Sequence, residues 1–386
     1  MPLDKIRRSS LHGLAGGARL RLLGPYDPIT PYDRSSPPFP GEGSTWWRKA
    51  VWESPFATSK VQWKVRYPTH PSTGTLPDAL ACDFHAPSAL TGQDVEHGLS
   101  VFASGQAATL FAKIFLIQMG VPKSEALRLT IDDLHLTSVA LTHLRSFENE
   151  RLADEHMRHL VRSVRYTHPH GWSLVESHGN LTLTVRGKEN GVSLQAYNKS
   201  RMSTVRANKA AYKAIAPTIV REETHLYESK LEELELTRLE AWRDAHEKGL
   251  YRRLHQEYFA AMFDLRQLKG LRQRRPRNLN TRGTPLLRKF ADWYFASGAP
   301  ESFPHLAGLK DPVSALSSLR VAALKTFDLN IDVPWAEHVP LLKSPLMRPL
   351  TCPPEFSPPP ERCAQAFCRE SWPDHLKAIK KVLDAA

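Results

Sequence analysis

Apolar and polar residues alternate in several short runs of the chain, and this period of two predicts β-strands. The clearest run is 60–67, and residues 79–85 suit a return strand after a loop rich in Pro, Gly, Ser and Thr. A third run covers 134–144. Residues 181–185 and 192–197 alternate on either side of a segment that ends in Asn190-Gly191, which is typical of a β-hairpin turn.

Other segments have the spacing of amphipathic helices. They cover 106–119, 148–164, 200–215, 250–268, 284–295, 311–327 and 375–383. Residues 231–242 fit either a strand or a helix. Helices and a hairpin mixed in this order predict an α+β fold, with a mainly antiparallel sheet and helices packed on it.

The positions of proline and the extent of the strand pattern divide the chain into three expected parts. Residues 1–57 are rich in proline, so we expect a basic arm without packed elements there. Residues 58–245 carry all the strand patterns and form the expected central domain. Residues 246–386 lose the strand pattern and predict a helical, basic C-terminal region.

Composition removes several classes of protein. The chain has 386 residues, a formal charge of +12 and four cysteines, too few for a disulfide scaffold. The N-terminus lacks the apolar stretch of a signal peptide, and the most apolar window, 103–121, contains Gln106, Lys113 and Gln118. We therefore expect no membrane insertion. Walker, dinucleotide-binding and Gly-x-Ser-x-Gly motifs are also absent.

Basic residues gather in one stretch, 265–290, which contains no acidic residue. An excess of Lys and Arg favours a polyanionic partner, with nucleic acid ahead of lipid. A solvated linker is the alternative. The expected phosphate-binding residues are Arg266, Lys269, Arg272, Arg274, Arg275, Arg277 and Arg282.

Two further motifs contain reactive side chains. Cys352, Cys363 and Cys368 lie near His375, but the spacing is looser than in paired zinc sites, so free thiols are the default and zinc the alternative. Tyr197 and Lys199 end the second hairpin strand and share one face of it. A tyrosine can act as a covalent nucleophile, although Tyr-x-Lys alone is common on edge strands.

Four segments in order resemble the rolling-circle replication initiators of filamentous phages and related plasmids, the gene II/X family. Residues 86–95 are similar to the family's Ser-Pro-Ala-Lys-x-Leu-x-Gly-His-Asn-Val segment, and 136–142 lie where the family has a Thr-Arg-Ile-Asp strand. Residues 194–199 resemble the Tyr-x-Lys strand, and 233–238 the Arg-Phe-Glu-x-Arg strand. The resemblance spans about 60–245.

This resemblance implies an HUH-related nuclease fold and a DNA-nicking enzyme of the bacterial cytoplasm. Tyr197 would attack a phosphate in single-stranded origin DNA, form a 5′-phosphotyrosine and later rejoin the strand, with Lys199 assisting. Mg²⁺ or Mn²⁺ would bind Glu235. Duplex origin DNA would bind the basic stretch, and a host helicase would unwind it.

The chain departs from the family pattern at two places. Ser138 and Ala140 stand where the family strand carries Arg and Asp, so one metal ligand is missing. His135, His143, Asp132 or Asp133 can substitute, and His135 is our first choice. The family's His-Asn pair is Gln93-Asp94 here. These departures favour the alternative function, a non-catalytic DNA- or RNA-binding regulator.

Overall fold

The computed structural model describes residues 11–14, 17–22, 46–56, 60–67, 79–91, 99–118, 122–177, 180–187, 191–198, 218–245, 249–277, 282–297, 300–353 and 372–386. The chain divides into two compact units. Unit 1 consists of residues 1–153, 175–259 and 352–386, and unit 2 consists of 154–174 and 260–351. The fold is α+β, as the sequence predicts.

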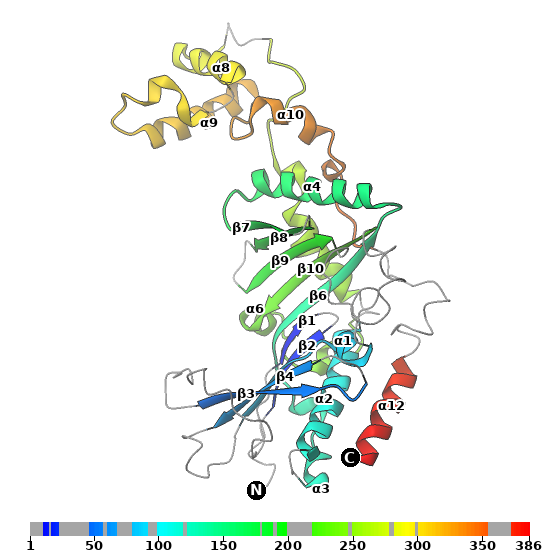
Figure 1. Cartoon of the computed structure of the whole chain (residues 1–386). Coiled ribbons are helices and arrows are strands. Elements are labelled where there is room, and N and C mark those ends of the chain that lie inside the picture. The colour runs from blue at the N-terminus through cyan, green and yellow to red at the C-terminus, as the bar shows by residue number, and fades with distance from the viewer. Residues whose placement is uncertain are drawn as a thin grey trace. The chain divides into compact units, whose positions relative to one another are not determined.

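A ten-stranded sheet with the order β3-β4-β5-β2-β1-β6-β10-β9-β8-β7 is the main feature of the chain (Figure 1). The paired strands are antiparallel except β1 and β6, which run parallel. The strands are β1 (Leu11–Leu14), β2 (Gly17–Leu22), β3 (Trp46–Glu53), β4 (Lys60–Tyr67), β5 (Ala79–Asp83), β6 (Leu136–Ser146), β7 (Trp172–Ser177), β8 (Asn180–Arg186), β9 (Val192–Asn198) and β10 (Ile219–Tyr227).

The described α-helices vary widely in length. They are α1 (Ala86–Thr91), α2 (Val101–Gln118), α3 (Lys123–Ala126), α4 (Glu150–Thr167), α6 (Glu228–Glu233), α7 (Leu250–Leu254), α8 (Pro285–Ser297), α9 (Pro312–Phe327), α10 (Trp335–Leu342) and α12 (Trp372–Ala385). A π-helical turn, η7 (His255–Ala260), continues α7. The predicted helices 106–119 and 148–164 of the central region correspond to α2 and α4.

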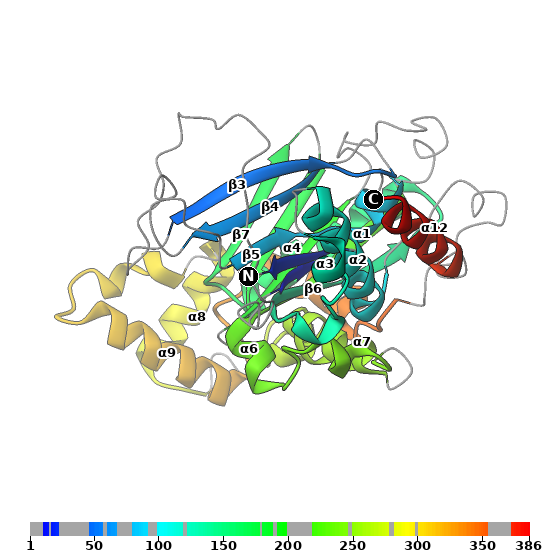
Figure 2. The ribbon, with the colours of Figure 1, turned by 90° about the horizontal axis from the view of Figure 1, so that it is seen from below.

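The core of unit 1 forms between the sheet and α2, which packs against β2 and α12 (Figure 2). The alternation that predicts β4 places Val61 and Trp63 in the core, and the Trp63 ring stacks on Phe115 of α2 at 4.7 Å between centroids. Stacked aromatic pairs contribute roughly 1 kcal/mol beyond the area that they bury. Among the described helices, α2 alone has the length and hydropathy of a membrane span, and 67% of it is buried inside the protein.

Two of the expectations about elements were wrong, and one central strand was missed. The arm of residues 1–57 contains β1, β2 and β3, and β3 pairs along its whole length with β4. The central strand β10 was not predicted, because Arg221, Glu222 and Glu223 follow one another and hide its apolar pattern. The strand that the resemblance implies at 233–238 is instead the end of α6 followed by a turn. The predicted helix 200–215 lies outside the described residues.

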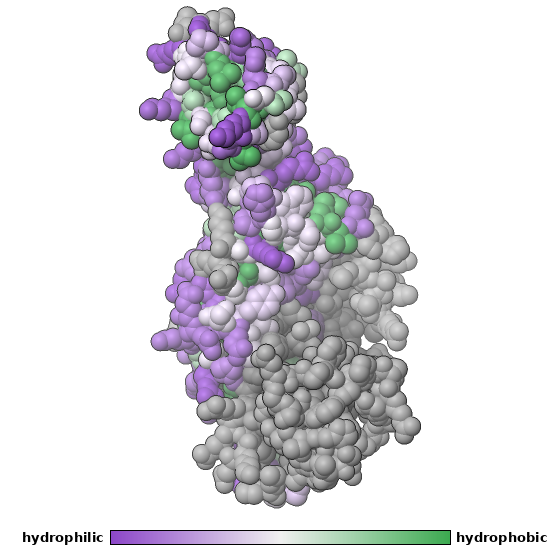
Figure 3. Space-filling view, turned by 90° about the vertical axis from the view of Figure 1, so that its left-hand side faces the viewer, coloured by the Kyte–Doolittle hydropathy of each residue, from purple (hydrophilic) through white to green (hydrophobic). Residues whose placement is uncertain are grey.

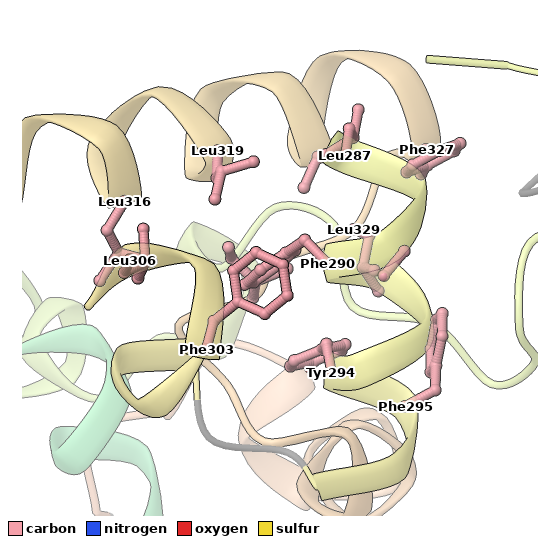
Figure 4. Close-up of a cluster of buried hydrophobic side chains, with 13 residues drawn as sticks. Leu287, Phe290, Tyr294, Phe295, Phe303, Leu306, Leu316, Leu319, Phe327 and Leu329 are labelled. Atoms are coloured by element: carbon pink, nitrogen blue, oxygen red, sulfur yellow. The ribbon is translucent and has the colours of Figure 1, made fainter. Parts of the chain in front are cut away.

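Unit 2 is helical and has a core of its own, formed by α8, α9 and the segments that join them (Figure 4). Phe290 and Phe303 meet edge to face at 5.0 Å between ring centroids. A polar network ties α8 to α10, because the Tyr294 hydroxyl lies 2.9 Å from Nε2 of the buried His338. The backbone N–H of Arg272 donates to Nδ1 of the same ring at 3.0 Å.

Apolar side chains also lie on the surface of unit 2, where Figure 3 shows hydrophobic residues in green. The large apolar residues of unit 2 that are exposed are Leu174, Leu286, Leu309, Val313, Val321 and Leu324.

Candidate active site

Three neighbouring strands bring Tyr197 together with ionisable residues of β10. Tyr197 of β9 is paired in register with Arg221, and Gln195 is paired with Glu223. Alternate residues of a strand share one face of a sheet, so Tyr197, Arg221, Glu223 and His225 lie on the same side. We call this group the tyrosine face.

The carboxylate of Glu223 is the centre of the tyrosine face. The Tyr197 hydroxyl donates a hydrogen bond to its Oε1 at 3.0 Å, and Arg221 Nε lies 2.6 Å from the same oxygen. Nε2 of His225 lies 3.0 Å from the other oxygen, Oε2. The side chains of Arg221 and Glu223 are only 3% and 4% exposed, so this ion pair is held in a low-dielectric setting.

The charge of Glu223 is fixed by these neighbours. Burial by itself raises its pKa, but the positive charge of Arg221 and the hydrogen bonds from His225 and Tyr197 more than offset this and lower the pKa from 4.5 to about 2. The ionised carboxylate therefore stabilises the fold at neutral pH. That contribution is present above pH 4.5 and is lost as the pH falls toward 2.

The strand β6 completes this face on the other side of β10. Glu223 is in register with Thr142, and His225 with Ala140. Arg221 Nη2 donates to the Thr142 hydroxyl at 3.2 Å. The position of Ala140, where the gene II/X family that the sequence resembles carries Asp, is thus directly beside the candidate site. Ala140 is fully buried there and offers no ligand.

Glu235 and His135, the expected metal ligands, do not lie on the tyrosine face. Glu235 is exposed on the turn after α6 and has a positive φ of 58°. His135 forms an isolated bridge with Arg238, and its Nε2 lies 3.7 Å from Glu228. Burial lowers the pKa of His135, and the Glu228 charge opposes this. The role predicted for Glu235 depended on a strand that the structure replaces with a helix and a turn.

Several predicted residues lie outside the part of the chain that the structure describes. They are Lys199, Gln93, Asp94, Cys363 and Cys368. Asp132 and Asp133 form a short turn, η3 (Ile131–Asp133), before β6, and Asp133 accepts a hydrogen bond from the Thr130 backbone at 2.7 Å. Asp133 therefore caps a turn.

The tyrosine face supplies two donors for a divalent cation. Oε2 of Glu223 and Nε2 of His225 are 3.0 Å apart, and one or two protein ligands with water and phosphate oxygens are typical of Mg²⁺ sites. Within the described residues, no group of three or more His, Cys, Asp and Glu side chains could hold a metal ion. These two atoms are hydrogen-bonded to each other, so they do not form a preformed metal site.

The opposite face of β10 carries a second buried carboxylate, Glu222. Arg145 Nε lies 2.5 Å from its Oε1, and His255 Nε2 lies 2.8 Å from its Oε2. Glu222 and His255 are fully buried. The rings of His143 and His255 meet edge to face, with 4.7 Å between their centroids. Nδ1 of His143 lies 3.5 Å from the Cys352 sulfur. We call these five residues the Glu222 cluster.

The Glu222 cluster also determines the protonation state of Cys352, the first residue of the cysteine motif. Burial, followed by the negative charge of Glu222, raises the pKa of the Cys352 thiol to about 11. Cys352 is therefore a protonated thiol at neutral pH, and it is one of two free cysteines among the described residues. A nucleophilic cysteine needs the thiolate form, so Cys352 is not a reactive thiol in this structure.

The predicted phosphate-binding residues belong to unit 2 and fall into two groups. Arg266, Arg272 and Arg275 have partners within the unit: Arg266 pairs with Asp264, Arg272 with Asp328, and Arg275 donates to the Phe295 carbonyl. The others are exposed. They are Lys269, Arg274, Arg277 and Arg282.

Sequence reasoning missed Arg221, Glu223 and His225. The signal that could have found them is the alternation of Arg221, Glu223, His225 and Tyr227 with Val220, Thr224 and Leu226 over nine residues.

Comparison of the chain with protein-family models, curated proteins and solved structures finds no match.

Proposed function

We propose that the chain is a DNA-nicking and DNA-joining enzyme that starts rolling-circle replication, with Tyr197 as its nucleophile and an HUH-related nuclease fold. The observation that carries the proposal is the hydrogen bond from the Tyr197 hydroxyl to a buried, ionised carboxylate, Glu223. A phenol becomes a nucleophile only when its proton has an acceptor. Glu223 is that acceptor.

In the proposed reaction, the Tyr197 oxygen attacks the scissile phosphorus and the bond to the 3′ oxygen breaks. The phenolic proton passes to Glu223, and the departing 3′ oxygen takes a proton from solvent. The products are a 5′-phosphotyrosine and a free 3′-OH, which can serve as a primer. Attack by a 3′-OH on the phosphotyrosine reverses the step and rejoins the strand.

Arg221 would couple this proton transfer to substrate binding. While Arg221 pairs with Glu223, the carboxylate has a pKa of about 2 and is a weak base. A DNA phosphate that draws the guanidinium toward itself removes the main influence that lowers this pKa. Burial then dominates and raises it. Glu223 becomes a stronger base only when substrate is present.

A divalent cation, Mg²⁺ or Mn²⁺, would be held by phosphate oxygens of the DNA together with His225 after its ring has left Glu223, so that the Glu223 carboxylate stays free to take the phenolic proton. It supplies polarisation of the scissile phosphate when bound. The proposed substrate is single-stranded origin DNA exposed in a duplex replicon of a bacterial host, with a host helicase extending the opening.

A second function, a DNA- or RNA-binding regulator without catalysis, is favoured by one observation. Ala140 offers no ligand at the position in register with His225. The two functions differ in their need for metal.

Metal removal is the test that separates them. With supercoiled DNA of its own replicon, we expect relaxed circles and a denaturant-resistant protein–DNA adduct in Mg²⁺ or Mn²⁺, and neither in EDTA. Both products are read on one denaturing gel. DNA binding without nicking in either metal would support the regulator and overturn the proposed enzyme.

Replacing Glu223 with Gln should slow nicking about 100-fold, because the amide keeps the hydrogen bond of Tyr197 but cannot take its proton. The measurement is the single-turnover rate on a single-stranded origin oligonucleotide. Glu235→Gln makes the same chemical change at the exposed turn and should leave the rate unchanged. Equal rates for Glu223→Gln and wild type would exclude Glu223 as the proton acceptor, provided that both proteins unfold at the same urea concentration.

A further inference from the structure

Unit 2 carries most of the net positive charge of the protein. Its 113 residues (21 in 154–174 and 92 in 260–351) include 17 Lys and Arg against nine Asp and Glu, a net charge of +8. The whole chain has +12, so unit 1 contributes only +4 from its 273 residues. A field this concentrated attracts polyanions and raises their association rate.

Within unit 2, the partnered arginines hold the basic segment in place. Arg272 donates to the Asp328 carbonyl at 2.9 Å, and the Arg275 guanidinium lies over the Phe295 ring at 4.9 Å from its centroid. These two side chains therefore act as anchors that fix the segment to the ends of α9 and α8.

The two ends of the basic segment return to the same part of the unit. The Asn330 N–H donates to the Gly270 carbonyl at 2.8 Å, just beyond the end of α9. At the other end, a Cβ added at Gly283 would lie 3.5 Å from the Phe327 ring, in the last turn of α9. Lys269 and Arg282, which adjoin these glycines, are therefore both held near the C-terminal end of α9.

The exposed cations of the segment are not neutralised. Lys269, Arg274, Arg277 and Arg282 form no ion pair with any described residue. Three acidic residues of the unit already have partners, because Asp264 pairs with Arg266, Asp328 with Arg272, and Asp332 with Arg320. We call these four side chains the basic patch.

The aromatic residues of unit 2 decide which form of nucleic acid suits the basic patch. Single strands are bound by stacking of bases on exposed aromatic rings. The rings of Phe290, Tyr294, Phe295 and Phe303 are buried in the core, and Trp293 and Trp335 pack against it (Figure 4). The aromatic rings of this core are thus not available for stacking, whereas the basic patch is exposed, and this combination suits the phosphates of a duplex.

We infer that unit 2 is a duplex-DNA-binding module that grips the phosphate backbone through Lys269, Arg274, Arg277 and Arg282, without reading the base sequence. Arg266, Arg272 and Arg275 maintain the fold of the segment and make no primary contribution to binding. This inference does not depend on the nicking chemistry of Tyr197, so it holds even where the test of the proposed nicking activity gives a negative result.

The test compares two charge-removal variants of the full chain by fluorescence anisotropy, with a labelled 30-base-pair duplex of arbitrary sequence. Both carry Tyr197→Phe and are measured in EDTA, so that no cutting occurs. One variant replaces the four patch residues with Ala. The control replaces Arg128, Lys377, Lys380 and Lys381, four exposed cations of unit 1, and changes the net charge by the same amount.

We expect the patch variant to bind at least about tenfold more weakly at 100 mM salt, and the slope of log K against log salt to fall by about four. The control should keep the wild-type slope, and a second duplex of unrelated sequence should give the same affinities. An equal loss in both variants would show that only net charge matters and would overturn the inference. Binding of the same variants to phosphatidylserine vesicles is measured in parallel. A patch variant that loses binding to the vesicles but keeps binding to DNA would overturn the inference and would show that the basic patch binds a membrane surface.

Discussion

Replacing Tyr197 with Phe should abolish both strand cleavage and the covalent adduct. The change removes one oxygen atom and keeps the ring beside the Arg221 guanidinium, which lies 5.9 Å from the ring centroid, so the fold should persist. Without that oxygen no phosphotyrosine can form, and the expected loss in rate exceeds about 10⁴-fold, the scale for removal of a covalent nucleophile. The measurement is conversion of supercoiled origin DNA to relaxed circles in Mg²⁺.

Tyr227→Phe is the matched control for this variant. Tyr227 lies on the same face of β10 but is 45% exposed, and its hydroxyl is 3.0 Å from Ser193 with no carboxylate beside it. It should nick at the wild-type rate. If Tyr197→Phe still cuts and attaches to DNA while Tyr227→Phe does not, the nucleophile is Tyr227 and the proposed role of Glu223 is wrong.

Glu222→Ala is expected to cost about 3 to 5 kcal/mol of unfolding free energy, the range for removing one partner of a buried ion pair. The substitution leaves Arg145 without its carboxylate and leaves His255 fully buried beside a cavity. Glu222 of β10 contacts Arg145 of β6 and His255 of η7, so the lost contacts lie at the centre of unit 1. Urea denaturation, followed by tryptophan fluorescence, measures it.

An exposed ion pair provides the comparison for Glu222. Glu240 lies 2.7 Å from Arg243, and their side chains are 47% and 55% exposed. Surface pairs of this kind contribute about 0 to 1 kcal/mol, so Glu240→Ala should leave the denaturation midpoint almost unchanged. A loss below about 1 kcal/mol for Glu222→Ala would mean that the Glu222 cluster does not stabilise the sheet.

The strands with clear alternation could be predicted from the sequence, because burial on one face imposes the period of two. The hairpin of β8 and β9 formed as expected, with Thr182 in register with Tyr197. The first three strands could not be predicted in the same way. They lie in a region where six prolines between 25 and 40 dominate the local pattern, and pairing with β4 and β6 outweighs this local preference.

The candidate site was only half predicted, for an electrostatic reason. Tyr197 was identified by its own motif, but its partners lie on a strand where three consecutive charged residues, 221–223, are all buried. A run of three charged residues predicts a solvent-exposed segment, unless each side chain is known to have a partner of opposite charge on the same face of the sheet. Glu222 finds Arg145 on one face and Glu223 finds Arg221 on the other. Only the strand register reveals this pairing.

The most direct test of the central claim is to find where the DNA becomes attached. Wild-type protein is incubated with the single-stranded origin oligonucleotide and Mg²⁺, digested with nuclease and trypsin, and analysed by mass spectrometry. The account predicts a nucleotide 5′-phosphate on the peptide that contains Tyr197, and on that tyrosine. A nucleotide attached to any other residue, or cleaved DNA without an attached nucleotide, would contradict it.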